Sequence, residues 1–401
     1  MAEKMKHILI FSHGLELGGA ERALIGLLHA LDYSKVQVDL FLMRHSGELM
    51  AHIPSQVNLL PEKPQYASLA VPFRTVVRNA QLGVALGRLW GKLAAKCRVR
   101  KLNITGDSGI ALEYSHKYTR VFMPNIGTRE YDLAVSFLTP HYFVAEKVRA
   151  KKKIAWIHTD YTMVSVDRVS ELAMWERYDY IASISDTVTD SFLKCFPSLE
   201  NRIVLIENIL PESVIRWQTD AFNAALEMSA EKTRLLSIGR FCYQKNFDNV
   251  PDICARLLKM GLDVCWYLIG FGGDEALIRQ KIREAGMEDH VILLGKRDNP
   301  YPYIKACDVY VQPSRYEGKA VTVREAQMLC KPVIITNYAT APSQLIDGVD
   351  GITVPMGNEG CAQGIAALLR DHEEMTLLSE NCRLRDYSNG GHAEKLLELL
   401  K

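Results

Sequence analysis

The stretch that decides the fold is Ser314-Arg-Tyr-Glu-Gly-Lys-Ala-Val-Thr-Val-Arg-Glu-Ala-Gln-Met-Leu-Cys-Lys-Pro-Val-Ile-Ile335. The residues before it, 308–312, are apolar and β-branched and predict a short buried strand, and residues 332–336 predict another. Residues 323–329 between them predict a short helix. This order indicates a parallel sheet, with the loop 314–321 at the carboxyl end of a strand. Open α/β sheets bind their ligands at such ends.

Two carboxylates mark this place. Glu317 lies in the loop and Glu325 in the first turns of the helix, with seven residues between them. Backbone amides at a helix start favour anions, so carboxylates there suit the recognition of hydroxyl groups beside a bound phosphate. The alternative is that both are solvated charges, because 24% of the chain is charged.

Lys331-Pro332-Val333 follows the predicted helix. With this ending, the region resembles the retaining glycosyltransferases of family four, also called group one. The resemblance implies an α/β protein of the GT-B fold, with two Rossmann-like domains facing each other across a cleft. It covers residues 232–355 well and only patches of 1–210. The family loop commonly contains Glu-Gly-Phe-Gly, whereas this chain has Glu317-Gly318-Lys319-Ala320. Lys319 could meet a phosphate or an acidic sugar, or it could point to solvent.

The bulk composition agrees with a globular cytoplasmic protein of two domains. The chain has 401 residues, 48% of them hydrophobic, and a net charge of +1, which gives no indication of a nucleic-acid partner. Its nine cysteines form no Cys-x-x-Cys pair, so neither a zinc site nor a disulfide framework is expected. The sequence has no signal-peptide layout and no apolar window long enough to span a membrane.

The alternation of strands and helices predicts the domain boundaries. Residues 1–210 should form an N-terminal Rossmann-like, acceptor-binding domain that carries a basic segment at 63–106. Residues 211–232 lose strand character and should be a linker. A C-terminal nucleotide-sugar-binding domain is expected over 233–385. The resemblance implies that a last helix, 386–401, packs back towards the N-terminal domain.

Glycines follow the first predicted strand, 7–11, at positions 14, 18 and 19. Glycines between a strand and a helix let the backbone approach a ligand and direct amides at an anion. The spacing is not Gly-x-Gly-x-x-Gly, which disfavours a nicotinamide cofactor. The resemblance implies that Gly18 and Gly19 face the phosphates and sugar of the donor, and the alternative is a simple tight turn.

Arg240 and Lys245 come after the predicted strand 234–238 and before a helix. Two cations five residues apart in this setting can converge on one phosphate group. The alternative is a pair of solvated surface cations. The pattern is similar to the diphosphate clamp of the family, and the resemblance implies that role here.

Further donor and catalytic contacts come from the resemblance. His158, at the carboxyl end of the predicted strand 153–157, would reach the transferred sugar, although a lone histidine is more often structural. Glu317 would hold sugar hydroxyls and Glu325 ribose hydroxyls. The remaining donor-binding candidates are Gly270 in a glycine turn, Arg297 beside the nucleobase, and the run Gly318, Lys319, Ala320 and Val321.

The basic segment has no Asp or Glu from residue 63 to 106. Arg88, Lys92, Lys96 and Arg100 form one stripe of a predicted helix, and Leu82, Leu86, Leu89, Trp90 and Leu93 line the neighbouring face. A basic amphipathic helix with a tryptophan suits an anionic membrane, here through residues 74–101. The alternative is a surface helix that packs Leu82, Leu86, Leu89 and Leu93 on its own domain.

Together these features predict a metal-independent retaining glycosyltransferase without a cofactor. The chain has no Asp-x-Asp pair to hold a divalent ion, so Arg240, Lys245 and the nearby helix start should meet the charge of the leaving diphosphate. We expect a nucleotide-diphosphate sugar as donor, a UDP-sugar above others. The acceptor should be a glycan or lipid-linked molecule of cell-surface polysaccharide biosynthesis, used in the cytoplasm or at the inner face of the membrane.

Two other hypotheses remain open. One is a nucleotide-sugar epimerase or a phosphorylase on the same architecture, which a lysine-bound pyridoxal cofactor or epimerisation without an acceptor would support. The other is a non-catalytic nucleotide-sugar-binding subunit. The presence of Glu317, Glu325, Arg240 and Lys245 together argues against this last hypothesis.

Overall fold

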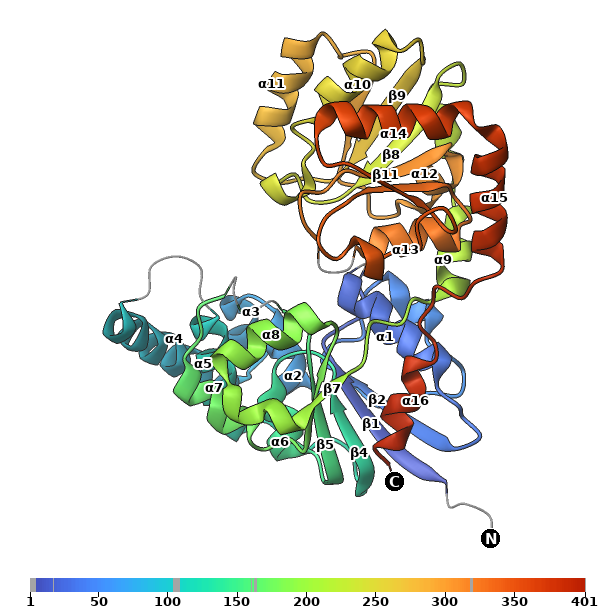
Figure 1. Cartoon of the computed structure of the whole chain (residues 1–401). Helices are drawn as coiled ribbons and strands as arrows, with labels where there is room; N and C mark the ends of the chain where they lie inside the picture. The colour runs from blue at the N-terminus through green and yellow to red at the C-terminus, as the bar shows by residue number, and fades with distance from the viewer. Residues whose placement is uncertain are drawn as a thin grey trace. The chain divides into compact units, whose positions relative to one another are not determined.

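The protein forms two compact units. The computed structural model describes residues 5–16, 18–103, 109–159, 161, 164–317 and 320–400. One unit, here the N-terminal domain, comprises Met1–Pro211 and Asn389–Lys401, and the other, the C-terminal domain, comprises Glu212–Ser388. Each domain is built around one sheet (Figure 1).

The sheet of the N-terminal domain has the strand order β3-β2-β1-β4-β5-β6-β7, with every described neighbour parallel. Its strands are β1 (Lys6–Ser12), β2 (Val36–Leu42), β3 (Asn58–Leu59), β4 (Tyr131–Ser136), β5 (Ala150–Ile157), β6 (Tyr180–Ser183) and β7 (Ile203–Leu205). The central strands are buried on both faces, as their nearly continuous apolar sequences require. The order reverses between β1 and β4, and such a switch point is where α/β sheets bind ligands.

Helices cover both faces of this sheet. They are α1 (Gly19–Ala30), α2 (Pro64–Ala67), α3 (Phe73–Arg78), α4 (Leu82–Leu102), α5 (Ile110–Thr119), α6 (His141–Lys147), α7 (Arg168–Trp175), α8 (Asp186–Cys195) and α16 (His392–Glu398). Short 3₁₀ turns are η1 (Glu48–His52), η2 (Ser68–Ala70), η3 (Arg120–Phe122) and η4 (Pro197–Arg202).

The C-terminal domain repeats the same plan. Its strands are β8 (Thr233–Ile238), β9 (Val264–Ile269), β10 (Val291–Gly295), β11 (Val309–Gln312), β12 (Val333–Thr336) and β13 (Ile352–Val354), in the order β10-β9-β8-β11-β12-β13. All described pairs are parallel. The order reverses between β8 and β11, so this domain has a switch point of its own. Two Rossmann-like domains, each with a sheet of parallel strands, confirm the predicted α/β fold class.

The helices of the C-terminal domain are α9 (Glu212–Thr219), α10 (Val250–Lys259), α11 (Glu275–Ala285), α12 (Tyr301–Ala306), α13 (Val321–Met328), α14 (Asn358–Arg370) and α15 (His372–Arg383), with 3₁₀ turns η5 (Ala224–Glu227), η6 (Tyr243–Lys245) and η7 (Ala341–Ser343). One stretch differs from expectation. Residues 211–232, expected as a linker, contain α9 and η5, and Val214 and Ile215 of α9 are buried. Helices α14 and α15 are separated at Asp371, whose carboxylate accepts the amide of Glu374 and caps α15.

The last helix, α16, belongs to the N-terminal domain (Figure 1). Its Leu396 is fully buried, and Lys395 donates to the carbonyl oxygen of Leu205 at 3.0 Å. The Nδ1 atom of His392 accepts the amide of Glu207 at 3.0 Å. The chain therefore returns to its first domain after completing the second.

A glycine stripe packs α4 against α5. Cβ atoms added to Gly83, Gly87 and Gly91 would lie 2.7 Å from Phe122, Thr119 and the carbonyl oxygen of Tyr114. The stripe continues at Ala95, which is buried. The two helices therefore approach so closely that only the smallest side chains fit between them, and the leucines of α4 lie elsewhere on the helix.

Candidate active site

The two loops at the switch point of the C-terminal domain meet through side chains. Lys245 comes from the loop after β8, and Glu317 from the loop after β11. The Nζ atom of Lys245 donates to Oε1 of Glu317 at 2.5 Å. Their side chains are only 15% and 6% exposed, respectively. The two predicted residues, 72 positions apart in the sequence, are thus brought together by the strand order.

The Glu317 carboxylate accepts three hydrogen bonds. Besides Lys245, the hydroxyl of Ser314 donates to Oε1 at 2.6 Å, and the side-chain amide of Gln244 donates to Oε2 at 3.1 Å. A carboxylate offers about four lone-pair positions. Glu317 can therefore accept a further donor, such as a sugar hydroxyl, while its orientation is already fixed.

Glycine permits the close approach of this loop to the sheet. The Lys245 side chain lies over Gly239, where a Cβ atom would be 2.9 Å from Cε of the lysine. A Cβ at Gly270, at the end of β9, would lie 1.8 Å from the carbonyl oxygen of Gly239, and Gly270 has a φ of +153°. Gly270, predicted as donor-binding, therefore has a structural role as well, because no other residue fits there.

Arg315 connects the two loops through side-chain and backbone contacts. It forms a bidentate ion pair with Asp248, with N–O distances of 2.9 and 2.7 Å, and stacks on the ring of Tyr243 at 4.1 Å. Its amide also donates to the carbonyl oxygen of Gln244 at 2.8 Å. Sequence reasoning missed Arg315, Gln244 and Ser314, although all three are neighbours of predicted residues and lie in the same two loops.

The second predicted cation, Arg240, does not join the pair at Glu317. It is exposed, and no hydrogen bond or ion pair ties it to another of the described residues. Its neighbour Phe241 is fully buried. Arg240 remains a free cation at the same end of β8.

Glu325 lies in α13, as predicted, but it is 97% buried, and its Oε1 accepts the hydroxyl of Tyr301 at 2.7 Å. Ala320, at the N-cap of α13, has its amide occupied by Oε1 of Gln344 at 2.7 Å. Val321, the first residue of α13, is 41% exposed. Gly318 and Lys319 lie outside the described residues.

Arg297 is bound by neighbouring side chains and is therefore not free to contact a ligand. It forms an ion pair with Glu227 at 2.7 Å and lies over the ring of Tyr303 at 5.5 Å. The hydroxyl of Tyr303 donates to the same Glu227 carboxylate at 2.9 Å. The three residues form a cluster at the edge of which Tyr303 is buried, so the predicted contact of Arg297 with a nucleobase would require this cluster to open.

The N-terminal domain has its own candidate residues at the switch point between β1 and β4. Gly18 is the N-cap of α1, and the Glu21 side chain folds back over it so closely that a Cβ at Gly18 would lie 2.0 Å from Oε2. Burial raises the pKa of this carboxyl. Gly19 is exposed with open space around it. A cavity of about 340 Å³ beside them is lined in part by His13, Glu16 and Arg44.

His158 is placed by β5, and its Nε2 lies 3.0 Å from the carbonyl oxygen of Phe137. A carbonyl oxygen can only accept, so Nε2 carries the proton and Nδ1 is left as an acceptor. This Nδ1 is buried and has no hydrogen-bond partner among the described residues. Burial lowers the pKa of His158 to about 4, which keeps the ring neutral at pH 7.

A cavity of about 220 Å³ surrounds His158 and also contains His116, His141, Glu113 and Glu171. Burial lowers the pKa values of His116 and His141 to about 3 and raises the pKa of Glu171 to about 7. The Oε1 of Glu113 accepts Ser170 at 2.7 Å, whereas its Oε2 has no partner within the described part of the chain. Buried polar atoms are rarely left unpaired, so these atoms indicate a bound hydroxylated molecule or water.

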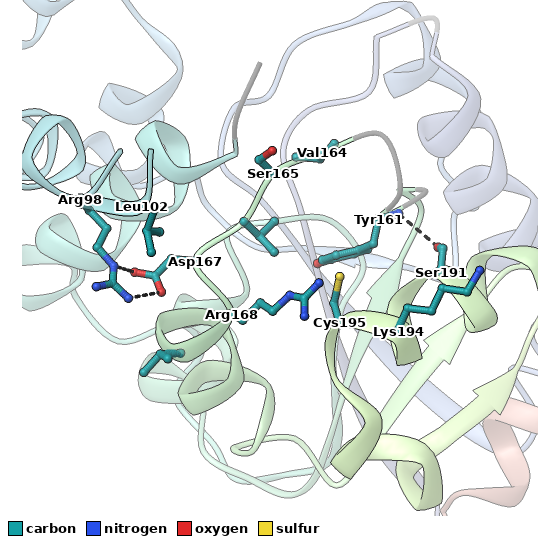
Figure 2. Close-up of a pocket in the computed structure, with 12 residues that line it drawn as sticks. Arg98, Leu102, Tyr161, Val164, Ser165, Asp167, Arg168, Ser191, Lys194 and Cys195 are labelled. Atoms are coloured by element: carbon teal, nitrogen blue, oxygen red, sulfur yellow. Dashed lines mark hydrogen bonds and ion pairs between the residues drawn. The ribbon is translucent and has the colours of Figure 1, made fainter. Parts of the chain in front are cut away.

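A larger cavity of about 680 Å³ lies between the end of α4, the loop before α7, and α8 (Figure 2). Arg98 and Asp167 close one side of it with a bidentate ion pair of 2.6 and 2.9 Å. Arg168 and Lys194 also line it (Figure 2). No cluster of three or more His, Cys, Asp or Glu side chains suited to hold a metal ion occurs in the described ranges.

Comparisons with known proteins match the C-terminal domain most clearly. The family model described as "Glycosyl transferases group 1" matches residues 218–385. The lipopolysaccharide core biosynthesis glycosyltransferase LpsE of Rhizobium meliloti is 28% identical over 158 residues, which are 39% of this chain and 45% of LpsE. The N-acetylgalactosamine-N,N'-diacetylbacillosaminyl-diphospho-undecaprenol 4-alpha-N-acetylgalactosaminyltransferase of Campylobacter jejuni is 30% identical over 37% of this chain and 40% of its own length. The chain thus spans less than half of these relatives.

Similarity of structure extends over the whole chain. The crystal structure of Anabaena HepE in complex with UDP and glucose superposes with a TM-score of 0.62 over 98% of each chain. The sequence identity is 16%, so this likeness concerns the fold. The Lys245–Glu317 pair lies inside the region that the family model matches.

Proposed function

Because the chain belongs to the group 1 glycosyl transferases and has the GT-B fold, we propose that it is a retaining glycosyltransferase. It moves a sugar from a nucleotide-diphosphate sugar to a glycan or lipid-linked acceptor of cell-surface polysaccharide biosynthesis. The observation that carries the proposal is the contact of Lys245 with Glu317 at the switch point of the C-terminal domain.

A UDP-sugar is the proposed donor. Support comes from HepE, which is described in complex with UDP and glucose. The proposed acceptor is supported by the Campylobacter jejuni relative, whose name describes transfer to a diphospho-undecaprenol-linked sugar, and by LpsE, which is named for lipopolysaccharide core biosynthesis. Each name describes that relative, and its extension to this chain is our proposal.

The chemistry assigned to the C-terminal domain is charge stabilisation. As the bond between sugar and diphosphate breaks, negative charge grows on the leaving oxygen. Lys245 is fixed within the site, and Arg240 is free to reach a second phosphate oxygen. Fixed donors of this kind typically contribute about 100- to 1,000-fold in rate. We propose that these cations suffice without a metal ion, and that Glu317 holds a sugar hydroxyl while Glu325 holds the ribose.

The N-terminal domain is proposed to bind the acceptor. Its cavity around His158 offers neutral imidazoles, and polar atoms of His158 and Glu113 that have no partner in the described part of the chain. These groups are suited to uncharged hydroxyl groups. The predicted contacts of Gly18, Gly19 and His158 with the donor sugar stay predictions. A lipid-linked acceptor would also place the protein at an anionic membrane surface, with residues 74–101 as the proposed contact.

Nucleotide release from a panel of UDP-, GDP- and ADP-sugars tests the proposal. We expect UDP release that depends on added polyprenyl-diphosphate-linked or free saccharide, that persists in EDTA, and that gives a product with the donor's anomeric configuration by NMR. Release that needs no acceptor would favour a hydrolase, and interconversion of the donor would favour an epimerase. Including uronic donors also tests the hypothesis that Lys319 recognises an acidic sugar.

A further inference from the structure

The outward side of α4 is apolar, the reverse of an ordinary surface helix. Leu82, Leu86, Leu89, Trp90 and Leu93 are 61%, 51%, 47%, 60% and 49% exposed. Their spacing of three and four residues places them on one side of the helix, and we call them the outer face of α4. Figure 1 shows α4 at the edge of the N-terminal domain, against α5. The interpretation that these leucines pack on their own domain is therefore wrong.

The inward side of α4 explains why the leucines face outward. Gly83, Gly87 and Gly91 contact α5 and η3 so closely that larger side chains cannot replace them there. The same contact keeps the outer face directed away from its own domain. Phe73 and Val77 of the preceding helix α3 are also exposed, at 45% and 46%. An exposed apolar area of this extent, rimmed by polar groups, marks an interaction surface.

The charges around the outer face are uniformly positive. Eight Arg or Lys residues occur between positions 74 and 101, and no Asp or Glu occurs from 63 to 106. Arg88 donates to the carbonyl oxygens of Ser68 and Val71, and Arg98 pairs with Asp167. The remaining six have no hydrogen-bond or ion-pair partner among the residues that the structure describes: Arg74, Arg78, Lys92, Lys96, Arg100 and Lys101.

We infer that the outer face of α4 docks on an anionic lipid bilayer, with the helix lying in the plane of the headgroups. Leu86, Trp90 and their apolar neighbours enter the boundary between headgroups and acyl chains, and the free cations bind lipid phosphates. Charge decides between this occupant and a second copy of the chain, because two copies of this face would bring like charges together. No helix among the described residues is long and apolar enough to cross a bilayer.

This inference extends the membrane location proposed above, but it stands on the helix and not on the transfer reaction. The full chain would be sedimented with vesicles of phosphatidylcholine, with and without phosphatidylglycerol. We expect about tenfold or stronger binding to the anionic vesicles, weakening with salt. On those vesicles the fluorescence of Trp90 should shift to the blue, and Trp90→Phe should lose the shift while still binding.

Two double variants, each with a matched control, separate the contribution of the apolar side chains from that of the positive charges. Leu86→Gln with Leu89→Gln should reduce binding to both kinds of vesicle, whereas the control Leu226→Gln with Leu384→Gln, which changes exposed leucines of the C-terminal domain, should not. Lys92→Gln with Lys96→Gln should abolish most of the preference for phosphatidylglycerol, about tenfold. The control with the same charge change is Lys259→Gln with Arg283→Gln.

Equal binding to neutral and anionic vesicles would overturn the inference, as would binding that none of the α4 variants changes. A concentration-dependent dimer that Leu86→Gln abolishes would show that a second copy covers the face instead, and would overturn it too. Nucleotide binding by the same variants, measured by thermal shift, keeps the two proposals apart. Loss of vesicle binding by the α4 variants with intact UDP binding is the expected result. A wild-type chain that binds UDP but no vesicles would contradict only the membrane face.

Discussion

At the scale of single residues, the Glu317 carboxylate shows how a site is organised before its ligand arrives. Three donors from two loops fix its orientation, and the arrangement needs a lysine at 245, an amide at 244 and a hydroxyl at 314. Fixed charges cost no reorganisation during reaction, which is why such arrangements accelerate transfer. The same contact has a structural consequence, because Glu317 would be a buried charge without its lysine.

The two predicted cations should therefore respond differently to substitution. Arg240→Met removes an exposed side chain without partners among the described residues, so we expect about 10- to 100-fold weaker UDP binding and an unchanged free energy of unfolding. Lys245→Met should weaken UDP binding as much and also destabilise the domain, because the buried Glu317 carboxylate loses its ion-pair partner. Titration calorimetry and urea unfolding measure the two quantities. Unchanged UDP binding by both variants would contradict the clamp.

Several residue contacts could not be predicted because their partners are far away in the sequence. Arg297 follows a predicted strand, where a ligand contact is reasonable, but Glu227 lies 70 positions earlier and captures it. Arg315 is held by Asp248, 67 positions away. The pairing of Lys245 with Glu317 could have been predicted, since both residues follow strands whose carboxyl ends share one edge of a parallel sheet.

At the scale of elements, the positions of the strands could be predicted from the sequence. Which side of a helix faces its own domain could not. Buried parallel strands are short apolar runs bounded by turns, and β8, β9, β10, β11 and β12 all follow that pattern. β13 has only three residues, too few to form such a run, and was missed. In α4 the sequence shows one stripe of leucines and one of glycines. Large apolar side chains usually face inward, but here the glycines do, because α5 approaches too closely for anything larger.

The packing of α4 on α5 predicts the effect of a single methyl group. Gly87→Ala would place a Cβ 2.7 Å from Cα of Thr119, and this overpacking should cost about 1–3 kcal/mol, partly offset by a gain in helix propensity of about 1 kcal/mol. We expect net destabilisation in urea unfolding. Gly391→Ala is the matched control in the same domain, because a Cβ there meets open space, and its effect should stay within about 0.5 kcal/mol. Equal effects would show that the glycine stripe does not limit the approach of α5.

At the scale of the molecule, the chain forms two domains of the same plan. The sequence predicted this repetition because the alternation of strands and helices restarts at β8. The return of α16 to the N-terminal domain was predicted only from the family resemblance. The sequence of the helix shows that one side is apolar and must be buried, but not against which domain. Its contacts are with Leu205 and Glu207, at the end of the first domain.

The buried histidines of the N-terminal domain predict a dependence of stability on pH. Burial lowers the pKa of His158 to about 4 and those of His116 and His141 to about 3, below the unfolded value near 6.5. As the pH falls below 6.5, only the unfolded state takes up these protons. Each histidine then lowers the free energy of unfolding by about 1.4 kcal/mol per pH unit.

Buried carboxyls whose pKa is raised act in the opposite sense, and the largest pKa shift among them is that of Glu171. Burial raises the pKa of Glu171 to about 7, so its contribution to stability is lost as the pH rises from about 4.5 to 7. Three histidines outweigh it, and urea unfolding should show falling stability from pH 6.5 to pH 5. Glu171→Gln should steepen this fall and His116→Phe should reduce it. A free energy of unfolding that does not change over this range would contradict the buried, neutral state of the histidines.

The most direct test of the central claim is a nucleotide-sugar panel read by thermal shift and calorimetry on the wild type and Glu325→Gln. We predict that one nucleotide-diphosphate sugar, a UDP-sugar above others, stabilises the wild type by roughly 2.7 kcal/mol at 100 times its dissociation constant. Glu325→Gln should fold normally and lose most of this effect, whereas Tyr301→Phe, which removes one hydrogen bond to Glu325 and keeps the carboxylate, should keep it. No stabilisation of the wild type by any nucleotide sugar would contradict the claim.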